Sequence, residues 1–404
     1  MNIYVARQPI FNRQLTVHGY EILYASAAPD YSDSLAGDEV AEAKIVNSFV
    51  SMDVDALSRG KKAYINVSRP LLDQGAALLL PHAVLVVELP RSAVIEQSAV
   101  DACAALKAQG YQLALDDFTL QGWPSALVDL ADIFKIDCGK TKLEEQQLVL
   151  NLAKSNRKKT VAFNIGDRKQ YQAAIGLGYD FCQGFFFCNP DFNDGKVILE
   201  NKLQHLLLLK EIHKFEIDFA RIEMLIKQDP ALSYKLLKHI NSLVFNFKFP
   251  ISSIRQAIAL LGQKNLIQWS ALVSLQNISS ALPGELIVTA VTRAYHCEAL
   301  ASRAFYQNES DSLFLAGLFS LLDVFLGRPM EAVLQEMPLA PGIKEMLLGK
   351  SNNLTPVLEL VVAHERADWL RVKKISTDLA IHQGQLYNAY LDAVKQANLI
   401  TVYH

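Results

Sequence analysis

Residues 112–118 read Gln-Leu-Ala-Leu-Asp-Asp-Phe, a short apolar run that ends in two acidic residues. Apolar runs of this length are typical of buried β-strands. Similar runs recur through the first 190 residues, and they predict further strands at Ala63–Val67, Ala83–Leu89, Asp132–Ile136, Thr160–Phe163 and Phe181–Phe187.

Helical segments separate these predicted strands, among them Ala93–Gln109 and Glu144–Asn156. Strands that alternate with helices indicate a parallel sheet with helical crossovers. Because the unit repeats so often, we expect the sheet to close into an α/β barrel.

Polar side chains lie at or near the ends of several predicted strands. They are Glu21, Asn66, Glu88, Asp116, Asp117, Lys135 and Gln183. Taken singly, each is more simply a solvated strand end. Taken together, carboxylates, an amide and a lysine at one end of a barrel suit divalent metals and phosphodiester hydrolysis.

The pattern changes at about Val197, where strand signals stop and helical periodicity begins. Val197–Lys214 is expected to be a connecting helix. Asp229-Pro230 predicts a helix start, Ser253 has the spacing of a capping residue, and Gly262 is a candidate helix end. The second half is therefore expected to be all-helical.

The composition excludes several classes of protein. The chain has 404 residues and a net charge of −3, which gives no reason to expect nucleic-acid or membrane binding. Its N-terminus does not read as a signal peptide, and the apolar run at Leu313–Leu326 is too short to span a bilayer. Five scattered cysteines suit a reducing compartment, so we expect a cytoplasmic protein.

The motifs of the first half resemble the EAL family of cyclic di-GMP phosphodiesterases over roughly residues 1–195. The matching segments, in chain order, are Gln8-Pro9-Ile10, Gly19-Tyr20-Glu21-Ile22-Leu23, Asn66-Val67-Ser68, Glu88-Leu89, Asp116-Asp117-Phe118, Lys135-Ile136-Asp137 and Gln183-Gly184. The resemblance implies a modified TIM-like barrel.

The resemblance also implies roles for individual residues. It assigns Mg²⁺ or Mn²⁺ to Glu21, Asn66, Glu88, Asp116 and Asp117. It assigns the dinucleotide to Gln8, Glu21, Asp117 and Gln183. Lys135 takes the catalytic role of holding the attacking water or a phosphate.

Four departures from the family pattern bear on activity. Where the family has an arginine that binds a phosphate, this chain has Ala25. Where the family has the general base, this chain has Phe163. At the positions of two further family glutamates, this chain has Gly166 and Arg91. A missing general base costs roughly 10²–10⁴ in rate. We therefore expect vestigial metal and catalytic sites, with a Mg or Mn cofactor only if activity remains.

Arg91 suggests a specific substitution. It follows Glu88 by three residues, so its guanidinium is a candidate to pair with Glu88 or Asp116 in place of a metal. The alternative is a solvated surface arginine.

The second half resembles HDOD domains from about Leu199 to beyond Gly327, which sets the expected domains at 1–195 (EAL) and 199–404 (HDOD). The matching segments are Gln228–Leu237, Asn241-Ser242, Ile251–Ile254, Ala257-Ile258 and Leu261-Gly262. Chains that join the two domains directly form a bacterial signalling family, and this chain resembles its members throughout.

HDOD domains are related to HD phosphohydrolases but lack their metal ligands. This chain has no His-Asp dipeptide, and Ser320-Leu321 stands where the relatives place it. We expect a surface for a protein partner instead. Phe245, Phe247 and Phe249 form either an exposed aromatic patch or part of the core.

Three functions fit these observations. The leading one is a catalytically inactive regulator that acts through a signalling protein bound by the HDOD domain, with a link to cyclic di-GMP control of motility or biofilm. The second is a cyclic di-GMP effector, and the third is a surviving phosphodiesterase. A homodimer is left open.

Overall fold

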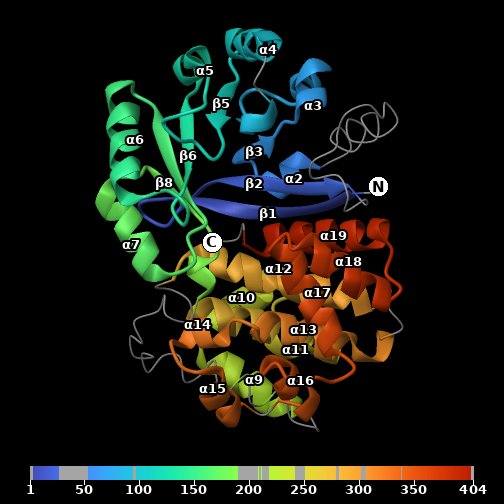
Figure 1. Ribbon diagram of the computed structural model, residues 1–404. Helices are drawn as coiled ribbons and strands as arrows, with labels where there is room; N and C mark the ends of the chain where they lie inside the picture. The colour runs from blue at the N-terminus through green and yellow to red at the C-terminus, as the bar shows by residue number, and fades with distance from the viewer. Residues whose placement is uncertain are drawn as a thin grey trace. The chain divides into compact units, whose positions relative to one another are not determined.

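The computed structural model describes residues 3–26, 53–93, 97–189, 208, 211, 218–241, 251–278, 282–301, 306–337 and 339–401. Its contacts divide the chain into two compact units (Figure 1). One unit, called the barrel unit here, comprises Met1–Phe192, Arg303–Phe305 and Glu359–His404. The other, the helical unit, comprises Asn193–Ser302 and Tyr306–Leu358.

Eight strands close into a barrel in the order β1 to β8. β1 is antiparallel to both of its neighbours, and the other pairs are parallel. The strands are β1 Ile3–Asn12, β2 Val17–Ser26, β3 Lys62–Asn66, β4 Leu85–Leu89, β5 Gln112–Leu115, β6 Ile133–Asp137, β7 Lys159–Phe163 and β8 Phe181–Gln183. The predicted α/β barrel is thus confirmed.

Two differences from the predicted strands concern the seam of the barrel. The predicted strands do not include β1 and β2, and Glu21 lies in the middle of β2, not at a strand end. β1 is buried at nearly every position, so it lacks the alternation of a half-exposed strand. The predicted strand Phe181–Phe187 ends at Gln183, and a 3₁₀ turn, Phe186–Cys188, follows.

The barrel interior is layered because side chains along a strand alternate between its two faces. An apolar layer consists of Ile10, Tyr64, Val86, Ala114, Ile133 and Val161. Two positions further along the parallel strands, on the same face, come Asn66, Glu88, Asp116, Lys135 and Phe163. The apolar layer therefore supports a layer of polar residues and Phe163.

Helices connect the parallel strands. They are α2 Val54–Ser58, α3 Arg69–Asp73, α4 Gln97–Ala108, α5 Ser125–Leu130, α6 Leu143–Ser155 and α7 Arg168–Leu177. α4 and α6 fall within or close to the predicted helical segments. Asp167 caps α7 by accepting a hydrogen bond from the Gln170 N–H at 2.8 Å.

The helical unit contains α9 Phe219–Gln228, α10 Pro230–Ile240, α11 Ile254–Ile278, α12 Gly284–Ala301, α13 Ser310–Phe319, α14 Leu322–Leu326, α15 Met330–Glu336, α16 Pro341–Leu347 and the first turn of α17 Thr355–Glu365. Its predicted helix boundaries are confirmed. Asp229 accepts from the Leu232 N–H at 3.2 Å, and Ser253 accepts from the Gln256 N–H at 3.4 Å. Gly262 interrupts α11 with a non-helical backbone. The predicted connecting helix, apart from residues 208 and 211, and the Phe245–Phe249 patch lie outside the described residues.

The C-terminal segment, defined as Glu359–His404, packs with the barrel unit. It contains most of α17, then α18 Trp369–Asp378 and α19 Gln383–Thr401, and Figure 1 shows α19 beside β1. Lys395 pairs with Asp53 at 2.7 Å, and the Asn398 amide donates to Ala56 O at 2.8 Å. The contacts thus group this segment differently from the expected 199–404 domain, whose boundaries stay a prediction.

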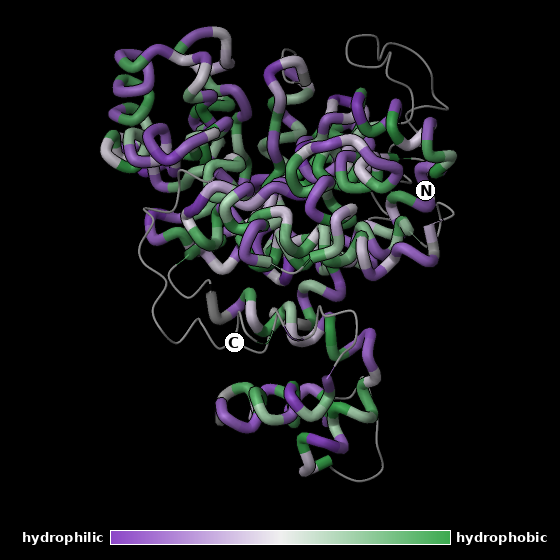
Figure 2. Tube along the Cα trace, turned by 90° about the horizontal axis from the view of Figure 1, so that it is seen from below, coloured by the Kyte–Doolittle hydropathy of each residue, from purple (hydrophilic) through white to green (hydrophobic). Residues whose placement is uncertain are grey.

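Apolar and polar residues alternate along the tube in Figure 2. Within the described ranges, the structure contains no helix both long and apolar enough to cross a membrane.

Candidate functional site

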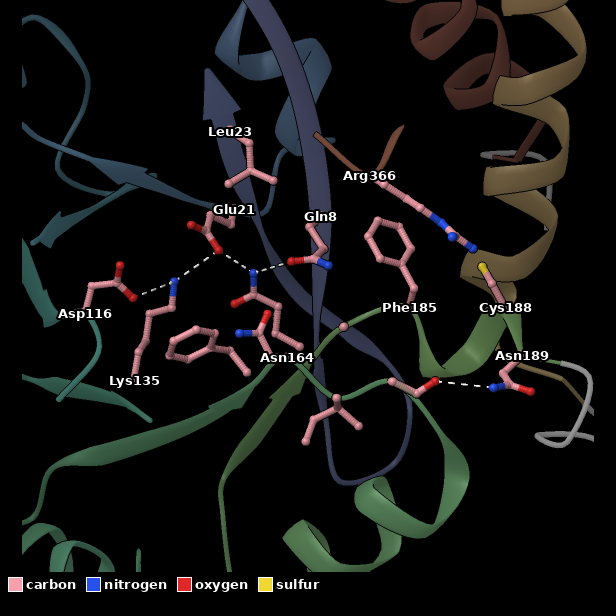
Figure 3. Close-up of a pocket in the computed structure, with 15 residues that line it drawn as sticks. Gln8, Glu21, Leu23, Asp116, Lys135, Asn164, Phe185, Cys188, Asn189 and Arg366 are labelled. Atoms are coloured by element: carbon pink, nitrogen blue, oxygen red, sulfur yellow. Dashed lines mark hydrogen bonds and ion pairs between the residues drawn. The ribbon is translucent and has the colours of Figure 1, made fainter. Parts of the chain in front are cut away.

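The carboxyl ends of strands β5–β8 open into a cavity of about 700 Å³ within the barrel unit (Figure 3). Its charged lining residues are Glu21, Asp116, Lys135 and Arg366. Its polar amides and aromatic rings are Gln8, Asn164, Gln183, Asn189, Phe163 and Phe185. The cavity therefore offers both charged and aromatic surfaces to a ligand.

The ammonium of Lys135 lies among three carboxylates. Its Nζ is 2.6 Å from Glu88 Oε1, 3.0 Å from Glu21 Oε2 and 3.5 Å from Asp116 Oδ1. Lys135 and Glu88 are almost fully buried, whereas the Asp116 side chain is 24% exposed. Three of the predicted metal ligands, Glu21, Glu88 and Asp116, thus converge on one buried cation.

Burial and mutual charge perturb this cluster strongly. Burial raises the pKa of Glu88 well above its usual value, and the nearby Glu21 charge raises it further. Burial would also raise the pKa of Glu21, but the Lys135 charge and hydrogen bonds from Gln183 outweigh it and lower that pKa. For Lys135, burial acts to lower the pKa, and the carboxylates overcome it and raise the pKa well above normal. Burial and the Glu21 charge thus favour the neutral form of Glu88, whereas the Lys135 charge favours the ionised form of Glu21.

A side-chain amide connects this cluster to β1. Gln183 Nε2 donates to Gln8 Oε1 at 2.7 Å and also to Glu21 Oε2. Gln8 and Glu21 are direct partners across the β1–β2 pair, which explains how one amide reaches both. Three of the four predicted dinucleotide-binding residues, Gln8, Glu21 and Gln183, are therefore neighbours.

Phe163 occupies the position where the resemblance places a general base. Its ring lines the cavity, and the Lys135 ammonium lies 5.5 Å from the ring centroid. An aromatic face attracts a cation but accepts no proton. The cavity remains open despite this large side chain.

A divalent metal does not fit the cluster in this arrangement. The carboxylate oxygens are suitable donors, but the Lys135 ammonium takes the space between them. A metal at the same oxygens would lie against a positive charge in a buried site, where repulsion is strong. Within the described ranges, no group of three or more His, Cys, Asp and Glu side chains is arranged to bind a metal.

Three of the five predicted metal ligands do not line the cavity, and one of them is the fully buried Glu88. Asn66 is half-buried, and Asp117 is exposed with a left-handed φ of 47°. The hypothesis that Arg91 pairs with Glu88 or Asp116 is wrong. Its guanidinium lies against Gly122, where an added Cβ would be 1.7 Å from Arg91 Nη2, and it has no ion-pair partner within the described residues. The cation at the carboxylates is Lys135 because its strand directs it into the barrel.

Sequence reasoning missed Arg366, Phe185 and Asn164 as lining residues. Asn164 is adjacent to Phe163, and its amide donates to Asp137 Oδ2 at 2.8 Å, so strand-end position is a usable signal for it. Arg366 follows α17, far from the barrel strands in sequence, and no local pattern connects it to the cavity.

In the helical unit, Ser320 stands where the resemblance to HD phosphohydrolases places their His-Asp pair. Its hydroxyl accepts a hydrogen bond from the Arg293 guanidinium at 2.9 Å and donates to Gly317 O at 2.7 Å. Arg293 is buried in α12. These contacts join α12 to the end of α13 and give the position a structural role.

Comparison with known proteins identifies both parts of the chain. A model of the EAL domain matches residues 66–190, and a model of the HDOD domain matches residues 204–337. Neither match includes Glu359–His404.

Two relatives match nearly the full length. The uncharacterized protein YuxH of Bacillus subtilis is 31% identical over 98% of both chains. CdgJ of Vibrio cholerae, named a cyclic di-GMP phosphodiesterase, is 31% identical over 96% of this chain and 91% of its own. Among solved structures, the EAL domain of Mycobacterium smegmatis DcpA matches with a TM-score of 0.37 and 20% identity, covering 45% of this chain and 90% of that one.

Proposed function

The chain belongs to the family of proteins that join an EAL domain to an HDOD domain, and from this membership we propose that it is a cyclic di-GMP signalling protein. Its barrel cavity binds the dinucleotide without efficient hydrolysis. The name of the relative CdgJ supports the ligand, and a cavity of about 700 Å³ with aromatic and charged walls is of a size that takes small molecules.

The observation that carries the proposal is the Lys135 ammonium lying among the three carboxylates. Three carboxylates that could hold a metal are bound to an internal ammonium, and the neighbouring wall carries Phe163 instead of a base. Hydrolysis needs an activated water, and the Phe163 ring accepts no proton from one. Binding needs only shape, aromatic surface and paired charge.

A second candidate function is phosphodiester hydrolysis. It is favoured by the full-length similarity to CdgJ, which is named as a phosphodiesterase. For this function, Lys135 has to leave the carboxylates so that a metal can replace it, and a group other than Phe163 has to accept the proton from water.

The output of the protein is proposed to be a partner protein bound by the helical unit. This follows from the absence of a metal-binding cluster among the described residues of that unit and from the structural role of Ser320. A domain without such a cluster is better suited to presenting a surface than to chemistry.

Calorimetric titration of cyclic di-GMP into the full chain tests the proposal, with Mn²⁺ and again with a chelator. The linear product is assayed in the same mixtures. Binding in both conditions with little product supports it. Rapid product formation only with Mn²⁺ establishes the second candidate, and no binding in either condition rejects both functions.

A further inference from the structure

Arg366 lines the barrel cavity although it lies in the C-terminal segment. It directly follows α17, and its backbone N–H donates to Val362 O at 3.2 Å. Ala367 then adopts a left-handed φ of 54°, and Asp368 caps α18 by accepting from the Arg371 N–H. This turn fixes the backbone from which the guanidinium extends.

The turn is held against the barrel by contacts on its C-terminal side. The Trp369 ring stacks on Tyr4 of β1, with centroids 5.6 Å apart and planes 9° from parallel. The Tyr390 hydroxyl accepts a hydrogen bond from the buried backbone N–H of Arg7. Since both anchors lie on β1, the strand that carries Gln8, the turn has a defined place beside the cavity.

The other charges of the cavity wall do not attract an anion, which makes the charge of Arg366 important. Glu21 and Asp116 repel an incoming anion, and the charge of Lys135 is already satisfied by carboxylates. Arg366 has no carboxylate partner among the described residues, and its guanidinium lies 5.9 Å from the Phe185 ring centroid. Figure 3 shows it beside Phe185 and Cys188, away from the Lys135 cluster.

We propose that Arg366 is a binding residue of the cavity that pairs with a phosphate of the ligand. This rests on the proposed function, which supplies the ligand class. A guanidinium offers several donors in a fork that fits phosphate oxygens, and its contact with Phe185 holds it next to an aromatic face suited to a nucleobase. The C-terminal segment thereby completes a site that the barrel strands leave without an available cation.

The experiment uses the full chain and two probes, cyclic di-GMP and its linear diguanylate product, titrated by calorimetry into the unmodified protein, Arg366→Ala and Arg366→Lys. Because Arg366→Ala loses a charge-assisted contact, its Kd is expected to rise by roughly tenfold to hundredfold. Arg366→Lys is expected to lose less affinity. The unmodified protein is also expected to lose affinity more steeply with added salt than Arg366→Ala does. The matched control is Arg371→Ala, because Arg371 is on the same segment but pairs with Glu359 at 3.2 Å and does not line the cavity.

Each outcome decides between the two proposals. Unchanged affinity in Arg366→Ala, or an equal loss in Arg371→Ala, overturns the role of Arg366 and leaves the proposed function standing. If the unmodified protein binds only the linear dinucleotide, cyclic di-GMP is the wrong ligand, and the effect of Arg366→Ala on the linear one decides the inference. Binding of neither probe overturns both.

Discussion

Lys135 places an ammonium group inside a barrel at the point where three carboxylates meet. Burying an ion pair gains little net stability, but removing one partner leaves buried charge uncompensated. We therefore expect Lys135→Met to lower the free energy of unfolding by about 3–5 kcal/mol, as measured by urea denaturation at neutral pH.

The control for this substitution is Lys140→Met. Lys140 pairs with Asp137 at 3.3 Å, but its side chain is 75% exposed, so its loss is expected to change stability little. Equal losses in the two variants would show that Lys135 does not compensate the carboxylates.

At the level of single residues, strand periodicity predicts which side chains of the site point into the barrel. Glu88 and Lys135 follow Val86 and Ile133 by two positions, so their inward direction follows from the alternation of a strand. The periodicity gives no information about which cation faces the carboxylates. It also gives none about Arg366, whose position depends on tertiary packing of a distant segment.

Among the helices and strands, the end of β8 depends on Gly184, which has no side chain. A Cβ on Gly184 would lie 2.0 Å from the Ile165 carbonyl oxygen, while Ile165 N–H donates to Gln183 O at 3.1 Å. Gly184→Ala therefore has to move the end of β8 or the loop after β7. We expect a loss of about 1–3 kcal/mol in urea denaturation, together with weaker ligand binding, since both segments line the cavity.

Gly176→Ala provides the matched control in α7. No atom lies within 4 Å of the added Cβ, and alanine favours a helix over glycine. This variant is expected to gain up to about 1 kcal/mol. A similar gain in Gly184→Ala would contradict the close approach of β8 and Ile165.

α17 contributes a pH dependence through His364. Burial against Tyr390 and Trp369 lowers the pKa of His364 from 6.5 to about 3, so it stays neutral in the folded protein. Below pH 6.5 the unfolded chain binds a proton that the folded protein does not, and stability falls as pH falls from 6.5 toward 3. The loss from this group is about 1.4 kcal/mol per pH unit.

Unfolding measured at pH 6.5 and 5 tests this, before most carboxylates titrate. His364→Leu is expected to flatten the dependence, whereas His382→Leu, at an exposed position of the same segment, keeps the slope of the unmodified protein. An unchanged slope in His364→Leu would mean that His364 is not the group responsible.

The helices and strands that could be predicted are those with a clear local sequence pattern. Parallel strands with apolar runs and helices with caps at Asp229 and Ser253 are marked in the sequence. The β1–β2 pair is not, because long-range pairing with β8 and β3 stabilises it on both sides. Its burial removes the polar alternation that identifies a strand.

For the whole molecule, the C-terminal segment is expected to unfold together with the barrel unit, because the two share a compact unit. The order of the sequence alone would instead group this segment with the helices before it. Segments that share a core unfold together, and separate cores can unfold separately. Trp123 and Trp369 lie in the barrel unit, stacked on Phe118 and Tyr4, and Trp269 is buried in the helical unit. The three tryptophans therefore report on both units and on the segment.

Single-tryptophan variants, with phenylalanine at the other two positions, separate these signals in a urea titration followed by fluorescence. We expect the Trp369 transition to coincide with that of Trp123 and to differ from that of Trp269. The reason is that Trp369 stacks on β1, while α18 and α19 place their anchors on β1 and α2 of the barrel. If Trp369 instead follows Trp269, the segment unfolds with the helical unit, as the order of the sequence alone would predict, and Arg366 loses its support at the cavity. A single transition for all three would mean that the two units unfold as one.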